Sequence, residues 1–218
     1  MKPICPSIIT NFGCDRNCWY CITKRQNPER FRQDTDWALL ELFLSRGWAR
    51  NKVSVSGGGD PLYNLEGNMD WWERLFNITD RLGMEVDVHT RIIVDKPDFW
   101  RRINRCCLSV DDVDSARRAL DLVTPHTRRR TRLVRVATPG TTIKELLDMR
   151  TFCASNGFQM SLKELAEFDD GGTFDKMKRI FKGTGVFMIE DRDYNVYYMP
   201  DNTITAKFRD PIPEGEQK

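Results

Sequence analysis

Apolar residues recur along the chain up to Leu165 with two periods, one typical of strands and one typical of helices. Alternating apolar and polar residues predict half-buried strands, and apolar residues at every third or fourth position predict helices that pack through one face. The predicted strands are Ile4–Phe12, Lys52–Ser56, Glu85–Arg91, Arg105–Asp111, Arg132–Ala137 and Phe158–Leu165. The predicted helices are Trp37–Arg46, Asn68–Leu82, Pro97–Asn104, Ser115–Val123 and Thr142–Ser155.

Strands and helices thus follow each other in six steps, which predicts an α/β fold with a parallel sheet and right-handed crossovers. Parallel strands covered on both faces are apolar throughout, but most of these strands alternate. One face is therefore expected to pack under the helices, and the other to be polar and concave. In Arg132–Ala137 we assign Val134 and Val136 to the helix side, which places Arg135 on the concave face.

The tail from Phe168 has a different pattern. Phe174–Phe181 is predicted to be a short helix, and Val186–Ile189 and Val196–Met199 are predicted to pair as a β-hairpin, with another turn at Asn202-Thr203. We expect a core of residues 1–168, an extension of residues 169–218 packed on it, and a loose end from about Pro211.

Composition narrows the classes of protein. The chain has 218 residues, enough for a sizeable core, and a net charge of +2, which leaves nucleic-acid binding open. No apolar run has the length of a membrane span, so we expect no membrane partner. Seven cysteines without a secretory signal favour a reducing, cytoplasmic location over a disulfide framework.

One stretch concentrates the candidate chemistry. Cys14, Cys18 and Cys21 have the spacing C-x3-C-x2-C, which requires a loop wrapped around one centre. Thiolates are soft ligands for iron–sulfur clusters, zinc or copper. Three cysteines on a four-iron cluster leave one iron open to a small chelating molecule. The alternative is a structural zinc site with a fourth ligand such as Cys5, although zinc sites commonly use paired spacings.

This spacing, with Tyr20 before the last cysteine, resembles the signature of the radical S-adenosylmethionine (SAM) superfamily. A second stretch, Ser56-Gly57-Gly58-Gly59-Asp60-Pro61-Leu62, resembles that family's glycine-rich motif, with Asp60 where glutamate is commoner. The resemblance implies an open (β/α)6 partial barrel, a 4Fe–4S cluster and SAM as cofactors. It also implies reductive cleavage of SAM to methionine and a 5′-deoxyadenosyl radical that abstracts a hydrogen atom from the substrate.

The resemblance also assigns residues to the cofactors. It places the cluster on Cys14, Cys18 and Cys21, and the SAM amino group on the backbone of Gly58, Gly59 and Asp60. Positions such as Ser109 and Asp111 often contact the SAM ribose or carboxylate, and Arg135 is a candidate for the carboxylate. Tyr20 and Leu165 would border the adenine.

The substrate is predicted less directly. His89, Arg91 and Lys163 are expected near the ends of concave-face strands, where ligands of parallel sheets bind, and favour a small, polar, anionic, nucleotide-derived substrate. Each has a structural alternative: His89 can be bonded within the interior, and Glu85, Asp87 and Asp111 can neutralise the cations. The basic run Arg128–Arg132 is either a solvated surface or a site for phosphate or an acidic partner.

Other functions remain open at this point. A small radical SAM protein can be an activase that installs a glycyl radical on a partner protein, or can modify peptides. A non-enzymatic iron–sulfur or zinc module is the alternative from another class. No cysteine follows Cys153, so an auxiliary cluster in the tail is not expected. The interpretation as a radical SAM enzyme also requires an electron donor such as flavodoxin or ferredoxin.

Overall fold

The computed structural model describes residues 5–16, 18–21, 34–48, 50–123, 125–165, 171–190 and 196–205. The predicted loose end from Pro211 lies outside these ranges. Across the described residues, none of the helices combines the length and the apolar character that a membrane crossing requires.

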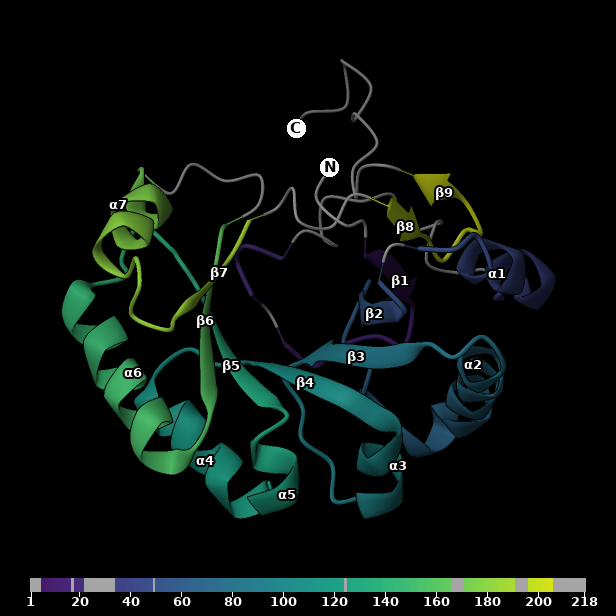
Figure 1. Ribbon diagram of the computed structural model, residues 1–218, viewed down its shortest axis with the longest axis horizontal. Helices are drawn as coiled ribbons and strands as arrows, with labels where there is room; N and C mark the ends of the chain where they lie inside the picture. Colours follow the sequence, from purple (N-terminus) through teal and green to yellow (C-terminus); the bar gives the residue numbers. More distant parts are fainter. Residues whose placement is uncertain are drawn as a thin grey trace.

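The strands form one curved sheet, with the helices on its outer side (Figure 1). Its order is β7-β6-β5-β4-β3-β2-β1-β8-β9, and every neighbouring pair is parallel except β8 and β9. The strands are β1 (Pro6–Thr10), β2 (Lys52–Gly57), β3 (Glu85–Thr90), β4 (Ile103–Ser109), β5 (Thr131–Val136), β6 (Gln159–Lys163), β7 (Phe187–Ile189), β8 (Val196–Tyr198) and β9 (Ile204–Thr205). The predicted parallel sheet of alternating strands and helices is confirmed.

The helices begin and end at residues whose chemistry explains the boundary. Asp36 caps α1 by accepting a hydrogen bond from the Leu39 amide, and Thr142 and Glu145 form a capping box at α6. Gly157 ends α6 in the left-handed conformation, which glycine adopts without a steric penalty. The helices are α1 (Trp37–Leu44), the 3-10 turn η3 (Glu66–Asn68), α2 (Met69–Arg81), α3 (Pro97–Arg102), α4 (Val113–Leu122), α5 (Pro125–Arg128), α6 (Ile143–Asn156) and α7 (Thr173–Ile180).

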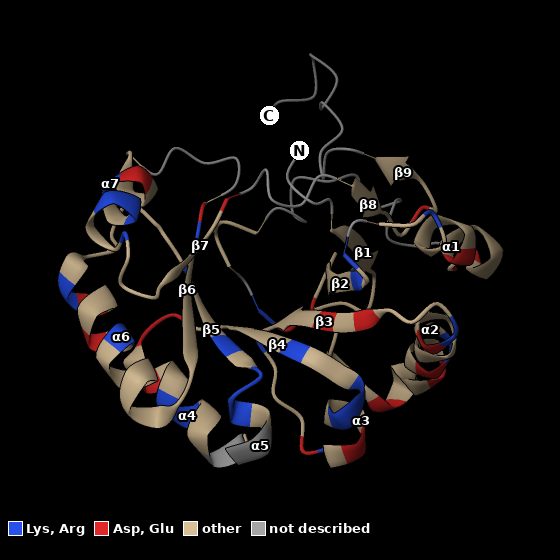
Figure 2. Ribbon diagram, in the orientation of Figure 1, with Lys and Arg blue, Asp and Glu red and all other residues tan. Residues whose placement is uncertain are grey.

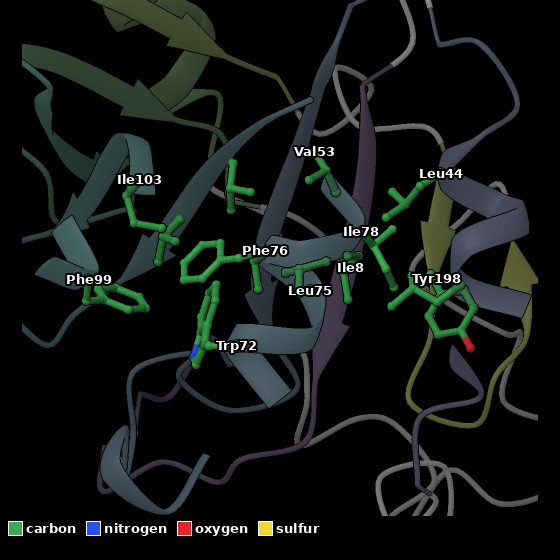
Figure 3. Packing of buried hydrophobic residues seen from close by; sticks show 14 of the residues in the cluster. Ile8, Leu44, Val53, Trp72, Leu75, Phe76, Ile78, Phe99, Ile103 and Tyr198 are labelled. Carbon is green, nitrogen blue, oxygen red and sulfur yellow. The ribbon is translucent and has the colours of Figure 1, made fainter. Parts of the chain in front are cut away.

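The core between the sheet and the first three helices is rich in aromatic residues (Figure 3). Trp72 of α2 is fully buried, and its ring packs edge-on against Phe99 with 5.0 Å between centroids. The Trp72 indole N–H donates to the carbonyl of Pro61 at 3.3 Å. The segment after the glycine run is therefore attached to the most tightly buried part of the core.

The tail departs from the prediction. β7 pairs with β6 and β8 pairs with β1, so these two strands flank the first six strands on opposite sides and the predicted hairpin between them is wrong. A hairpin does exist, but it joins β8 to β9, and the predicted turn at Asn202 is confirmed, with φ of +61°. The division into residues 1–168 and 169–218 stays a prediction.

Candidate active site

One cavity of about 270 Å³ opens at the carboxyl ends of the strands and reaches into the barrel interior. The three motif cysteines border it, together with the glycine run and the ends of β3, β4 and β6. Residues far apart in the sequence therefore meet at one place. Ligands of parallel α/β sheets bind at this end of the strands.

The cysteine loop follows β1 directly. Cys14 is exposed, Cys18 and Cys21 are half-buried, and the Cys21 amide donates to the Cys18 carbonyl at 3.2 Å. The Arg16 amide donates to Cys14 Sγ at 3.3 Å, but partial burial still raises the pKa of that thiol. Among the described residues, no group of three or more Cys, His, Asp or Glu side chains is gathered closely enough to hold a metal ion. The cysteines share a cavity without forming a preassembled ligand set.

The four cysteines outside the motif are buried or partly buried. All seven are free thiols. Burial raises the pKa of Cys5 and Cys107 to about 11 and that of Cys153 to about 12, so these thiols stay protonated. None of these three borders the cavity, which disfavours Cys5 as the fourth ligand of a zinc site.

The glycine run packs directly against the cysteine loop. The Gly58 amide donates to the Thr10 carbonyl at 2.8 Å, and the Asp60 amide donates to the Gly13 carbonyl at 2.7 Å. Gly59 has φ of +157°, and a Cβ atom there would lie 2.3 Å from the Gly13 carbonyl oxygen. The two motifs form one interlocked unit, and Gly59 is needed for their contact.

Asp60 is 4% exposed, and its carboxylate accepts three hydrogen bonds from within the chain. The donors are the Leu62 amide at 2.9 Å, the Thr90 hydroxyl at 2.6 Å and the Arg91 amide at 2.7 Å. Burial raises the pKa of Asp60, and these three donors oppose that rise. The side chain joins the end of β2 to the end of β3, which leaves the backbone of the run to face a ligand.

Arg91 projects from the end of β3 toward the cysteine loop. Its Nη1 lies 2.9 Å from Cys18 Sγ and 3.4 Å from the Tyr20 hydroxyl, and its Nη2 pairs with Asp111. Burial acts to lower the pKa of Arg91, but the hydrogen bond and charge of Asp111 outweigh it, so the guanidinium stays charged. Arg91 borders the cavity, and its side-chain contacts are with the cysteine motif and with Asp111.

The structure places five more of the predicted residues at the cavity. Tyr20, Ser109, His89, Lys163 and Leu165 all border the cavity. Burial, followed by the charges of Lys163, Arg132 and Arg105, lowers the pKa of His89 to about 3, so its ring is neutral at pH 7.

Arg135 does not lie on the concave face, and that prediction is wrong. It is registered beside Leu162, which is fully buried under the helices, whereas Val134 and Val136 border the cavity. The basic residue of β5 that lies on the inner side is Arg132, which donates to Gln159 Oε1 at 3.2 Å and covers the ring of Phe187. Arg129 and Arg130 of the same basic run are exposed.

Thr90 and Tyr197 are among the residues that border the cavity and that sequence reasoning missed. Thr90 ends β3 next to Arg91, so its position was available from the strand itself. Tyr197 belongs to β8, and its register with Ser7 of β1 brings it to the site. No local pattern in the sequence indicates that a strand near residue 197 lies beside the first strand.

Comparisons with solved structures identify the fold. SuiB from Streptococcus suis bound to S-adenosylmethionine matches over 95% of this chain and 61% of that chain, with a TM-score of 0.61 and 13% identity. SuiB bound to its precursor peptide SuiA matches over 85% of this chain and 48% of that chain, with a TM-score of 0.56 and 16% identity. The chain spans half to three-fifths of the length of these proteins.

No protein-family profile matches the sequence, and a comparison with curated proteins finds no match. At 13–16% identity, the structural likeness shows the fold. It confirms the predicted open α/β partial barrel. The chain thus has the α/β partial-barrel fold seen in SuiB with S-adenosylmethionine bound.

Proposed function

We propose that the protein is a radical SAM enzyme, with a 4Fe–4S cluster on Cys14, Cys18 and Cys21. The observation that carries the proposal is the single cavity that these cysteines share with the glycine run, in a barrel with the fold of a SAM-bound protein. When bound, the cluster supplies the electron that splits SAM into methionine and the 5′-deoxyadenosyl radical.

The chain fits this cofactor in its donor chemistry. Three thiols come from one loop, and the Arg91 guanidinium lies beside one of them. The sulfurs must close together around the cluster, and the interlocked glycine run fixes the base of their loop. In the proposal, the Gly58, Gly59 and Asp60 backbone receives the SAM amino group, and Tyr20, Ser109 and Asp111 border the rest of SAM.

The substrate proposed is small and anionic. Lys163 and His89 border the cavity from β6 and β3, and both side chains can donate hydrogen bonds, since the His89 ring is neutral with one N–H. Glu164 also borders the cavity and can orient a cation or a hydroxyl group. A cavity of about 270 Å³ is close to the lower limit for small-molecule sites.

The cofactor is tested by anaerobic reconstitution with iron and sulfide. We expect about four iron atoms per chain and formation of 5′-deoxyadenosine from SAM after reduction. Cys14→Ala, Cys18→Ala and Cys21→Ala should each lose the cluster, whereas Cys5→Ala, outside the cavity, should keep it. Purified protein that retains stoichiometric zinc and takes up no iron would instead indicate a zinc module.

A peptide substrate is the second candidate, because one SuiB structure holds the precursor peptide SuiA and the sheet here is open, with β7 and β9 at its two edges. The two candidates can be separated with metabolite and peptide pools from cells grown in deuterated medium. The pool whose addition transfers deuterium into 5′-deoxyadenosine contains the substrate. Transfer from the peptide pool alone would reject the small-molecule proposal.

A further inference from the structure

Arg91 is held more firmly than a surface arginine. Its amide donates to the buried Asp60 carboxylate at 2.7 Å, and its side chain is only 17% exposed. Because Asp60 also receives the Thr90 hydroxyl, the end of β3 is fixed at two successive residues. The guanidinium therefore reaches the cysteine loop from an anchored backbone.

The guanidinium joins two parts of the candidate site. One nitrogen, Nη1, lies 2.9 Å from the sulfur of Cys18, and the other, Nη2, pairs with Asp111 just beyond β4. Two further charged residues, Lys163 and Glu164 at the end of β6, border the same cavity. Among the contacts described here, Arg91 is the cation that lies against a cysteine of the C-x3-C-x2-C motif.

We propose that Arg91 sets the reduction potential of the cluster through its hydrogen bond to the Cys18 sulfur, with Asp111 moderating its charge; the inference rests on the proposed function. Reduction adds one electron, delivered by a flavodoxin- or ferredoxin-type donor, to a cluster whose ligands are already anionic thiolates. Hydrogen bonds to the sulfurs and nearby net charge are the main determinants of such potentials. A cation at Cys18 stabilises the reduced state, and the partly exposed Asp111 carboxylate opposes it.

The test is a mediated redox titration of the reconstituted protein without SAM, followed by electron paramagnetic resonance. Arg91→Gln should make reduction roughly tenfold less favourable, a potential lower by about 59 mV for one electron. Arg91→Lys, which keeps the charge, should recover part of the shift. Asp111→Asn should shift the potential in the opposite direction, because it removes the countercharge. Arg135→Gln is the matched control, since it removes a cation from the helix side of β5.

A lower potential in Arg91→Gln, a higher one in Asp111→Asn and none in Arg135→Gln would support the tuning role. Equal potentials in all variants would overturn it, even though the cluster and SAM cleavage remain intact. If the wild type takes up the cluster and Arg91→Gln, Arg91→Lys and Asp111→Asn do not, the ion pair only holds the loop in place and the tuning role is rejected. A wild type that binds no cluster would instead reject the proposed function.

Discussion

The two ends of the barrel interior contain similar residues but use them differently. At the start of the strands, Asp87 accepts a hydrogen bond from Asn104 Nδ2 at 2.7 Å, and Arg132 donates to Gln159 at 3.2 Å. At the other end, Lys163 and His89 border a cavity. Figure 2 shows that charged residues lie on β3, β4 and β5 as well as on the helices.

The difference teaches that alternation alone does not distinguish a structural polar residue from a functional one. Both ends follow the same two-residue period, yet at the start of the strands side chains on neighbouring strands pair with each other. Strand direction separates the two roles, because the connections that carry motifs follow the carboxyl ends of parallel strands. Four changes test this contrast.

Gly59→Val should have the largest effect, a loss of nearly all cluster loading. Its Cβ atom would lie 2.3 Å from the Gly13 carbonyl, next to Cys14, and its φ of +157° disfavours a side chain. The measurement is iron content after reconstitution, with circular dichroism to check folding. Gly140→Val is the control, because nothing lies within 4 Å of a Cβ atom there. Wild-type iron content in Gly59→Val would show that the two motifs are not interlocked.

Lys163→Ala should leave uncoupled SAM cleavage intact and weaken substrate binding ten- to a hundredfold, as expected for loss of a charge-assisted hydrogen bond of about 1.5–3 kcal/mol. Lys163 borders the cavity from β6, whereas the motifs lie beyond β1 and β2. The assay has two measurements. Deuterium transfer at limiting substrate reports substrate binding, and unlabelled 5′-deoxyadenosine formed without substrate reports uncoupled SAM cleavage. Loss of both activities would place Lys163 in the cofactor site or the framework.

His89 predicts a pH effect on folding. Its folded-state pKa of about 3 lies below the unfolded value of 6.5, so the unfolded chain binds a proton that the folded chain does not, and stability falls as pH drops from 6.5 toward 3. Between pH 7 and 5 this should cost roughly 2 kcal/mol. Urea unfolding at both pH values should show a change that is more destabilising in the wild type than in His89→Gln by that amount.

The comparison with His89→Gln is necessary because the raised pKa values of Asp60 and Asp87 change stability in the opposite direction. As pH falls, protonation of these two acids stabilises the folded protein. The pH dependence of wild-type stability therefore contains both effects. Equal pH dependence in the wild type and in His89→Gln would show that the ring is protonated in the folded protein.

Lys52→Gln should have the smallest effect. Lys52 pairs with Glu85 at 2.7 Å at the start of β2 and β3, but both side chains are partly exposed. Such a pair contributes at most about 1 kcal/mol. Thermal unfolding should change little, and cluster loading and SAM cleavage should equal those of the wild type. A loss of cluster in this variant would contradict the separation of the two ends.

The local part of the fold was predictable from the sequence, and the long-range part was not. Caps at Asp36 and Thr142 and the glycine after α6 identify helix boundaries because their interactions are local. β5 misled us because Leu133 and Val134 are both buried, so apolar residues do not mark one face of the strand. The packing of Leu133 and Ala137 under the helices decides which face that is.

The same limit applies to the site. The motifs predict which residues gather at the strand ends, but not that Arg91 turns toward Cys18 and Asp111. That contact depends on the anchoring of β3 by Asp60 and on the path of the cysteine loop, and neither has a periodic signal. In the same way, the residues of β7 and β8 do not indicate which side of the sheet each strand joins.

The pairing of β8 with β1 has a consequence for the order in which the barrel assembles. Pro6 is registered with Val196, so β1 gains this outer neighbour only after the segment between the two strands has been synthesised. Contacts between residues so distant in sequence form slowly, because a long loop must close before they are gained. Until then the edge of β1, directly before the cysteine loop, presents unpaired backbone groups to other chains. Until this edge is completed, the nascent chain is therefore exposed to misassembly.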